Sequence, residues 1–305
     1  MSWHILGGGS LGCLWAARLQ LAGHPVRLIL RPAAFEQFQA GHNQLFFTDL
    51  HPQRHTLTLP AETATSGTAI QRLIVATKAH AAASAVAGIR HRLQAGSQLL
   101  LLQNGIGSQQ EVAALVPDLP VMVASSTEGA WLQAPFDCVH AGAGQTLMGD
   151  LQGGAQAPDW LASLQQAGIA CQWHSDILPV LWRKLAINCL INPLTGIHQC
   201  RNGELAQHTG QINLLAAELQ QLLHAAGQPE AAQDLPATAL QVIRNTAANR
   251  SSMLQDVQQG RRTEIRYITG FALQQCQQLN LDCPQLTALH EQLQQQLRQL
   301  GLPDD

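Results

Sequence analysis

The sequence predicts an α/β protein with a doubly wound parallel sheet in its first half and an all-α second domain. Short apolar runs alternate with helical stretches up to about residue 150, and a glycine motif joins the first run to the first helix. From about residue 175 the pattern is almost wholly helical. Alternating strands and helices are typical of a parallel sheet covered on both faces. We therefore expect one domain over residues 1–174 and a helical domain over residues 175–305.

The expected elements follow one another in a regular order. Residues 3–6 (WHIL) resemble a short buried strand, residues 10–23 a helix ended by Gly23, and residues 26–30 (VRLIL) a second strand. Further strands are expected at 72–77, 98–103 and 121–126, with a helix at 80–93 between the first two. Residues 129–150 are punctuated by glycine and proline, and we expect them to form hairpin strands that close the sheet.

Composition excludes several classes of function. The formal net charge of −3 gives no basic footprint for nucleic acid. The seven cysteines are scattered, odd in number and free of CxxC, which indicates free thiols in a reducing cytosol. The histidines show no metal-ligand spacing, and no apolar run reaches the roughly 18 residues of a membrane span. We expect a cytoplasmic protein without a signal peptide that binds no metal, nucleic acid or membrane.

A glycine motif, Gly7-x-Gly9-x-x-Gly12, lies directly between the first expected strand and the first helix. The first glycine allows the tight turn, the second lets the backbone approach a pyrophosphate, and the third lets helix and strand pack closely. The helix N-terminus presents free N–H groups to the phosphates. The motif favours a Rossmann-type dinucleotide site over a glycine-rich turn in an unrelated α/β protein. The loop comprises Gly7, Gly8, Gly9, Ser10, Leu11 and Gly12.

The end of the second strand indicates which dinucleotide is bound. NAD enzymes usually place an acidic residue there for the ribose 2′-hydroxyl, whereas this chain has Arg31 and no acid. An arginine suits a 2′-phosphate through charge-assisted hydrogen bonds, so we predict NADPH/NADP+ as cofactor. The alternative is a surface arginine near a strand end. Lys78 and Asn104 follow two other strands, and each alone is compatible with an ordinary turn.

A polar stripe interrupts the apolar segment 182–194 (WRKLAINCLINPL). Lys184, Asn188 and Asn192 are spaced by four residues, so on a helix they cover an arc of about 80° and a length of roughly 12 Å. Unpaired buried amides and ammonium groups are costly, so the stripe needs partners. It is either a solvated or internally bonded helix face or a ligand site. Pro193 is expected to kink or end the helix just past Asn192, leaving the stripe at a cleft between domains.

Taken together, these residues make the chain resemble the ketopantoate reductase (2-dehydropantoate 2-reductase) family over nearly its whole length. The resemblance is strongest in GGGSLG (7–12), LQNGIG (102–107), KLAINCLINPLTGI with NGEL (184–205), and SSMLQD with RTEIxYIxGF (251–271). The last two segments are much more specific than the glycine motif. The resemblance implies NADPH-dependent reduction of 2-dehydropantoate to (R)-pantoate, a step toward pantothenate and coenzyme A. The partner is then a small molecule, and the protein is a monomer or a homodimer.

The resemblance also implies roles for individual residues. Lys184 matches the catalytic lysine, and Glu264 matches an essential glutamate that is also near the cofactor. Substrate contacts are implied for Asn104, Asn188, Asn192, Asn202 and Ser252. Cofactor contacts outside the glycine loop are implied for Arg31, Lys78, Asn104 and Ala130, the last in a segment (TEGAW) where members vary.

The chemistry of these side chains agrees with such roles. A lysine can stabilise the negative charge that develops on a ketone oxygen and deliver a proton as general acid. Asn188 and Asn192 both donate and accept hydrogen bonds, Ser252 can donate to a carboxylate, and Glu264 can accept from the terminal hydroxyl of the substrate. Without the resemblance, the alternative for Glu264 is a simple first-turn carboxylate of a helix that begins there, favoured by the helix dipole.

Two other functions stay open at this point. The first is reduction of a different 2-oxo acid by the same architecture, because the sequence does not measure the volume of the pocket. The second is a non-catalytic regulator that senses NADP, which needs no acid lysine. The presence of both Lys184 and Glu264 argues against the regulator.

Overall fold

The computed structural model describes residues 2–154 and 156–305, which divide into two compact units. The first unit comprises Met1–Gln103 and Ser108–Ile177, and the second comprises Asn104–Gly107 and Leu178–Asp305. The sequence places the change between residues 174 and 175 and leaves residues 104–107 in the first domain. The short loop groups with the second unit, where the Ile106 N–H donates to the Tyr267 carbonyl oxygen at 3.0 Å.

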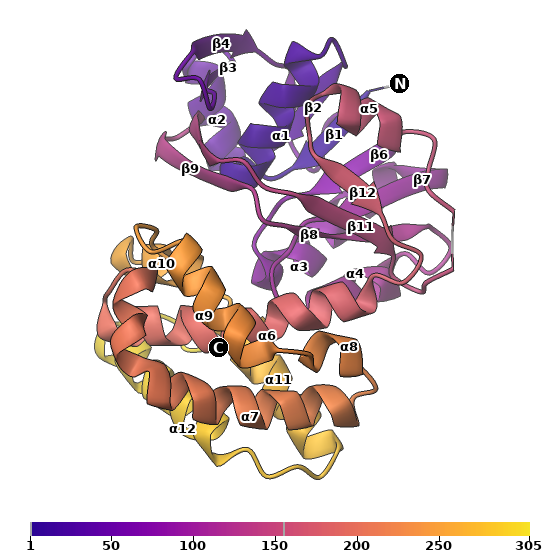
Figure 1. The fold of residues 1–305 in the computed structure, drawn as a ribbon. Helices are drawn as coiled ribbons and strands as arrows, with labels where there is room; N and C mark the ends of the chain where they lie inside the picture. The colour runs from indigo at the N-terminus through magenta and orange to yellow at the C-terminus, as the bar shows by residue number, and fades with distance from the viewer. Residues whose placement is uncertain (1, 155) are drawn as a thin grey trace. The chain divides into compact units, whose positions relative to one another are not determined.

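The first unit is built on an eight-stranded sheet with the order β12-β11-β8-β7-β6-β1-β2-β5 (Figure 1). Six neighbouring strands of this sheet (β8, β7, β6, β1, β2 and β5) are all parallel, and β11 runs antiparallel to β8. This confirms the predicted parallel sheet. The strands are β1 (Trp3–Leu6), β2 (Val26–Ile29), β5 (Ala61–Glu62), β6 (Ile70–Val75), β7 (Leu93–Leu101), β8 (Val121–Ser126), β11 (Thr146–Asp150) and β12 (Cys171–Trp173).

Helices connect these strands, as the alternating pattern predicts. Helix α1 carries a buried apolar side that includes Leu14, Trp15 and Leu19, and it packs with strand residues into one core. Within this core, the rings of Trp3 and Trp160 meet edge to face, with centroids 5.3 Å apart. The helical segments are α1 (Ser10–Leu21), α2 (Pro32–Ala40), α3 (Ala79–Ile89), the 3₁₀ turn η1 (Arg90–Arg92), α4 (Ser108–Leu115) and α5 (Leu161–Gln166).

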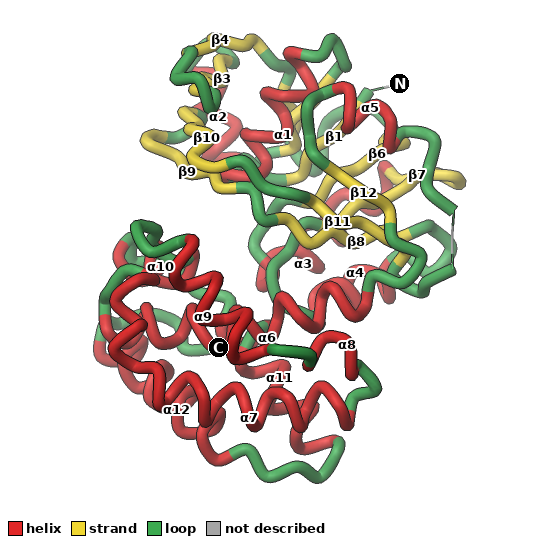
Figure 2. Tube along the Cα trace, viewed as in Figure 1, coloured by secondary structure: helices red, strands yellow, loops and turns green. Residues whose placement is uncertain are grey.

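A second sheet in the first unit corrects one prediction. Strands β9 (Gly129–Ala134) and β10 (Asp137–Gly142) form the expected hairpin, but they pair with β3 (Gln44–Thr48) and β4 (Arg54–Thr58) in a separate sheet ordered β4-β3-β10-β9 (Figure 2). Only β11 joins the main sheet. The Phe46 N–H donates to the Phe136 carbonyl oxygen at 2.9 Å, and Phe136 packs on Phe38 with ring centroids 4.6 Å apart. The hairpin thus pairs with β3 and not with the main sheet.

The second unit is helical apart from its loops, as predicted. Leucines of its long helices, including Leu190, Leu219 and Leu293, are fully buried and form its core. The segments are α6 (Leu178–His198), η2 (Asn202–His208), α7 (Thr209–Ala225), α8 (Pro229–Ala232), α9 (Leu235–Asn245), α10 (Ser252–Gln258), η3 (Ile265–Tyr267), α11 (Thr269–Gln278) and α12 (Pro284–Gln299). In the described part of the chain, none of the helices has both the length and the hydropathy that crossing a membrane requires.

Pro193 does not end its helix, so the predicted stop just past Asn192 is wrong. Helix α6 continues through Pro193 to His198, although the proline ring removes one donor from the helix. Pro193 is buried, as are its neighbours Ile191 and Leu194. Burial of this apolar segment outweighs the cost of a proline inside a helix, about 3 kcal/mol.

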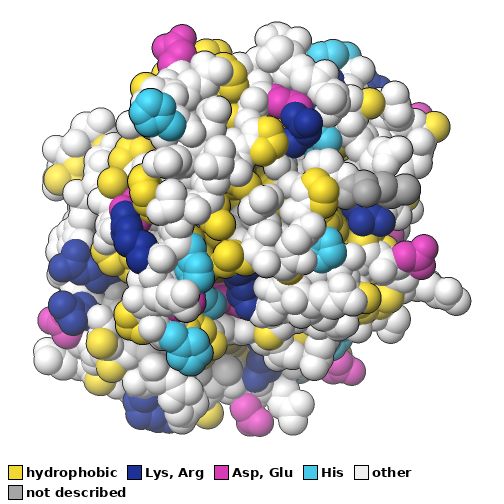
Figure 3. Space-filling model, turned by 90° about the horizontal axis from the view of Figure 1, so that it is seen from above, with side chains coloured by type: hydrophobic (Ala, Val, Ile, Leu, Met, Phe, Trp, Pro, Cys, Tyr) yellow, Lys and Arg dark blue, Asp and Glu magenta, His cyan; other side chains and the backbone are white. Residues whose placement is uncertain are grey.

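The surface agrees with the low charged fraction of 12%. Uncharged polar side chains and backbone cover most of the face shown in Figure 3, and charged side chains lie among them.

Candidate functional site

The glycine loop has the backbone geometry that the motif predicts. Gly7 has φ +112°, a conformation that L side chains rarely adopt, and its N–H donates to the Ile29 carbonyl oxygen at 3.1 Å. A Cβ on Gly12 would lie 2.2 Å from the Gly7 carbonyl oxygen, so only glycine lets α1 start this close to β1. Gly9 is exposed, and a Cβ there would meet nothing closer than 3.8 Å. The backbone at Gly9 is therefore open to a ligand.

The start of α1 is also suited to an anion. Gly9 is the N-cap and provides no side-chain cap, and the first turn carries no acidic residue. Ser10 and Leu11, which open the helix, are only partly buried. The first N–H groups of a helix carry partial positive charge and attract phosphates. The loop therefore fits the pyrophosphate of a dinucleotide.

Two buried polar atoms next to this loop have no hydrogen-bond partner among the described residues. They are Thr77 Oγ1 and Gln103 Oε1, at the carboxyl ends of β6 and β7. The amide Nε2 of Gln103 donates to the carbonyl oxygens of Val75 (2.9 Å) and Thr77 (3.0 Å), which ties the two strand ends together. A buried polar atom without a partner costs about 1–3 kcal/mol. A polar ligand at this edge would remove that cost, which again fits a dinucleotide.

Arg31 and Lys78 follow the two strands that flank β1. Arg31 is the exposed N-cap of α2, two residues after β2 ends, and Lys78 is the partly buried N-cap of α3, three residues after β6 ends. Because these strands are parallel, their carboxyl ends lie at the same edge as the glycine loop. Ligands bind at this edge in doubly wound sheets.

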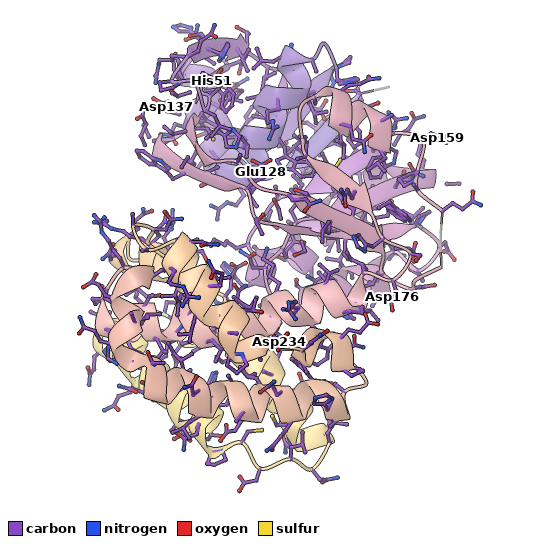
Figure 4. The ribbon with its side chains drawn as sticks, in the orientation of Figure 1. His51, Glu128, Asp137, Asp159, Asp176 and Asp234 are labelled. Carbon is purple, nitrogen blue, oxygen red and sulfur yellow. The ribbon has the colours of Figure 1, made fainter. Side chains whose placement is uncertain are left out.

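Ala130 lies on β9, in the second sheet, and its register partner is His140. The hairpin that carries it reaches the glycine loop, since a Cβ on Gly8 would lie only 2.8 Å from the Phe136 ring. Glu128, labelled in Figure 4, anchors the start of β9. Its carboxylate accepts a hydrogen bond from Arg18 of α1 at 2.8 Å and lies 2.6 Å from His140 Nε2.

In the second unit, the polar stripe lies on α6 as predicted. Lys184 and Asn188 are partly buried and Asn192 is buried. Burial lowers the pKa of Lys184 to about 8, and the carboxylate of Glu264 acts in the opposite direction by raising it. Lys184 and Glu264 are therefore close enough to interact electrostatically. A lysine with a pKa near 8 is suited to proton transfer at neutral pH.

Glu264 lies in the second unit, where it meets the loop that follows β7. Its side chain is 4% exposed, and its Oε2 accepts a hydrogen bond from Asn104 Nδ2 at 3.4 Å. Glu264 is the N-cap of the short turn η3, whereas the regular helix α11 begins only at Thr269. The expectation that Glu264 starts a helix therefore holds for one 3₁₀ turn. The structure brings together Lys184, Glu264 and Asn104, which are far apart in sequence.

Asn202 and Ser252 lie along a different segment of the same unit. The Asn202 N–H donates to the Asn249 carbonyl oxygen at 3.0 Å, which places Asn202 beside the chain that leads to Ser252, the first residue of α10. Its amide Nδ2 donates to Thr246 Oγ1 at 2.8 Å. Its Oδ1 is buried and has no partner among residues 2–154 and 156–305. Asn202 can therefore accept a hydrogen bond from a ligand.

Several residues that the sequence does not point to support these side chains. The Tyr267 carbonyl oxygen accepts a hydrogen bond from the loop after β7, and Phe136 contacts the glycine loop. Thr195 and Ser251 form a hydrogen bond between α6 and the start of α10. Ser251 alone has a recognisable signal, because a serine directly before the helical segment SMLQDV is typical of an N-cap.

No group of three or more histidine, cysteine, aspartate or glutamate side chains within the described ranges is arranged to hold a metal ion. The described side chains therefore offer a dinucleotide cradle in the first unit and a lysine–carboxylate pair with amides in the second.

Comparisons with known proteins match the N-terminal and the C-terminal part of the chain to two separate family models. The family model "Ketopantoate reductase PanE/ApbA" matches residues 3–153, and "Ketopantoate reductase PanE/ApbA C terminal" matches residues 176–297. A 2-dehydropantoate 2-reductase of Vibrio cholerae is 34% identical over 296 residues, covering 95% of each chain.

Solved structures show the same fold. A PanE/ApbA family ketopantoate reductase from Ralstonia eutropha JMP134 has a TM-score of 0.89 at 22% identity, covering 99% of this chain and 100% of that one. The ternary structure of D-mandelate dehydrogenase with NADH and anilino(oxo)acetate also has a TM-score of 0.89, at 20% identity and the same coverage.

Proposed function

Because the chain belongs to the ketopantoate reductase family, we propose that it reduces 2-dehydropantoate to (R)-pantoate with NADPH, a step toward pantothenate and coenzyme A. The family consists of oxidoreductases, and the relatives match this chain along almost their whole length. The observation that carries the proposal is the electrostatic interaction between Lys184, whose pKa burial lowers, and the buried carboxylate of Glu264.

A nicotinamide dinucleotide is the cofactor that the glycine loop supports, and when bound it supplies the hydride. The open backbone at Gly9 and the uncapped start of α1 suit its pyrophosphate. Arg31 suits a 2′-phosphate and therefore favours NADPH. NADH is the alternative, because it is bound in the D-mandelate dehydrogenase structures, which share the fold.

Lys184 is the proposed proton donor. With a pKa of about 8, most Lys184 side chains are protonated at neutral pH. The ammonium group then stabilises the negative charge that develops on the ketone oxygen as it is reduced, and donates the proton that completes the alcohol. Glu264 favours the protonated form of Lys184 by its charge.

The remaining polar residues are proposed to hold the substrate. Asn188 and Asn192 can bond both the ketone and the carboxylate, and Ser252 can donate to the carboxylate. Glu264 is proposed to accept from the terminal hydroxyl. Asn202 can accept a hydrogen bond from the substrate through its unpartnered Oδ1. The amide of Asn104, held by Glu264, is proposed to contact both cofactor and substrate.

A substrate panel tests the proposal. Purified protein is assayed for NADPH oxidation with 2-dehydropantoate, with 3,3-dimethyl-2-oxobutanoate, which lacks only the terminal hydroxyl, and with 2-oxoisovalerate. We expect kcat/KM to be at least about 100-fold higher for 2-dehydropantoate, because a site built to bond a hydroxyl strongly rejects the analogue without it. Equal or higher kcat/KM with either analogue contradicts the proposed substrate.

Reduction of an aryl 2-oxo acid with NADH is the second candidate function. It is favoured by the TM-score of 0.89 to D-mandelate dehydrogenase. Adding phenylglyoxylate with NADH and with NADPH to the panel decides between them. No turnover with any of the acids would instead favour the non-catalytic regulator.

A further inference from the structure

A chain of three side-chain hydrogen bonds joins the stripe on α6 to the start of α10. Thr195, which is fully buried, lies one turn after Asn192, and its Oγ1 donates to the Asn192 carbonyl oxygen at 2.9 Å. The same Oγ1 is 2.7 Å from Ser251 Oγ. Ser251 Oγ in turn accepts from the Leu254 N–H at 3.0 Å as the N-cap of α10.

We call this chain of hydrogen bonds through Thr195 and Ser251 the relay. Its direction follows from the number of protons that each hydroxyl group can donate. A hydroxyl group has one proton to donate. Thr195 uses its proton on the Asn192 carbonyl oxygen, so Ser251 must donate to Thr195. The relay therefore runs one way, from the Leu254 amide through Ser251 and Thr195 to the Asn192 backbone, and each hydroxyl both donates and accepts.

The relay connects two residues that the family resemblance assigns to substrate binding. Asn192 is bonded through its carbonyl oxygen, and Ser252 follows Ser251 directly. The bond lies next to Pro193, where the helix lacks one backbone donor and would otherwise be free to bend. Because Thr195 and Ser251 are 0% and 7% exposed, water does not replace their bonds easily.

We propose that Thr195 and Ser251 are positioning residues, which set the distance between Asn192 and Ser252 for the substrate. This inference rests on the proposed function. Neither residue needs to touch the substrate. A shift of about 1 Å in groups that orient a substrate can lower the rate about 100-fold, so the loss of one buried hydroxyl has a measurable effect.

The test compares Thr195→Val, which keeps the shape and removes the hydroxyl, with Thr195→Ser, which restores it. We expect Thr195→Val to raise KM for 2-dehydropantoate about tenfold and to leave Kd for NADPH unchanged. Thr195→Ser is expected to return KM to within about threefold of the wild type. Because the two hydroxyls act as one relay, adding Ser251→Ala to Thr195→Val is expected to raise KM little further.

Thr146→Val is the matched control. Thr146 is also fully buried and bonds a serine hydroxyl, Ser126 Oγ, at 2.9 Å, but it lies in the first unit. We expect it to lower Tm by an amount similar to Thr195→Val while leaving KM for 2-dehydropantoate within about twofold. If both valine variants lower Tm and leave KM for 2-dehydropantoate unchanged, Thr195 is merely structural and the proposal is wrong.

Two outcomes separate this proposal from the proposed function. A wild-type protein that reduces no 2-oxo acid contradicts the proposed function, and the positioning role with it. An active wild type with unchanged KM in Thr195→Val contradicts only the positioning role. If Thr195→Val does not fold, Ser251→Ala alone carries the test, since it breaks the same relay and is expected to raise KM.

Discussion

Asn104 Nδ2 lies 3.4 Å from Glu264 Oε2, although 160 residues separate them in the sequence. The loop Asn104–Gly107 is fixed to the second unit by two further features. The Ile106 N–H donates to the Tyr267 carbonyl oxygen, and a Cβ on Gly105 would lie 2.1 Å from that same oxygen. The loop thus reaches the carboxylate only because residue 105 is a glycine.

Gly105→Ala is therefore expected to damage the site. Gly105 has φ +77°, so alanine adds the cost of a left-handed conformation, about 1–2 kcal/mol, to the clash with Tyr267. Gly96→Ala is the control, because Gly96 has φ +85° but a Cβ there would meet nothing within 4 Å. We expect Gly105→Ala to lower both Tm and kcat/KM well below the values of Gly96→Ala. Equal effects in the two variants would show that the contact with Tyr267 is unimportant.

The pH dependence of kcat is expected to report on Lys184. Its pKa of about 8 means that the proton donor is lost as the pH rises through 8, so kcat should fall there. Because the charge of Glu264 raises the pKa of Lys184, Glu264→Gln should move this fall to lower pH. The measurement is kcat against pH for both proteins at saturating substrate. If kcat of Glu264→Gln falls at the same pH as that of the wild type, Glu264 does not influence the pKa of Lys184 and the prediction is wrong.

Burial of Lys184 is also expected to cost stability. Between about pH 8 and the ordinary lysine pKa, the unfolded chain holds a proton that the folded chain has lost, so stability increases with pH in this range. Lys184→Met removes this cost and is expected to raise the free energy of unfolding at pH 7 by on the order of 1–3 kcal/mol. The gain should shrink at pH 10.

Urea denaturation at both pH values measures this effect. A less stable Lys184→Met protein at pH 7 would mean that the ammonium group has net favourable interactions in the folded state.

Cofactor preference is expected to depend on Arg31. A charge-assisted hydrogen bond to a phosphate contributes about 1.5–3 kcal/mol, so Arg31→Ala should raise KM for NADPH roughly 10-fold to 150-fold and barely change KM for NADH. Arg90→Ala, another exposed arginine of the first unit, is the control. An unchanged preference for NADPH over NADH in Arg31→Ala would show that Arg31 does not bind the 2′-phosphate.

The sequence predicts the parts of the fold that depend on local pattern. The period of the apolar residues and the glycine spacing predict β1, α1 and the open backbone at Gly9, because each rests on neighbouring residues. The stripe on α6 follows in the same way from a spacing of four residues. The features that the sequence does not predict depend on contacts between residues that are far apart in the chain.

Pro193 and Phe136 show the physical reason for the differences. The local rule for proline ends a helix, but packing around the buried Pro193 keeps α6 continuous to His198. The sequence pattern of the hairpin that contains Phe136 is compatible with the main sheet. Only its pairing with β3 assigns it to the second sheet. The relay through Thr195 depends on the relative placement of α6 and α10, which no local pattern specifies.

Comparison of wild-type protein with Lys184→Ala in the reduction of 2-dehydropantoate by NADPH tests the account most directly. We predict that kcat/KM falls by roughly 10²–10⁴-fold, the scale for one positioned general acid, while NADPH binding measured by fluorescence is unchanged. The cofactor cradle lies in the first unit and Lys184 in the second, so the two effects are separable. A Lys184→Ala protein with kcat/KM near the wild-type value would contradict the account.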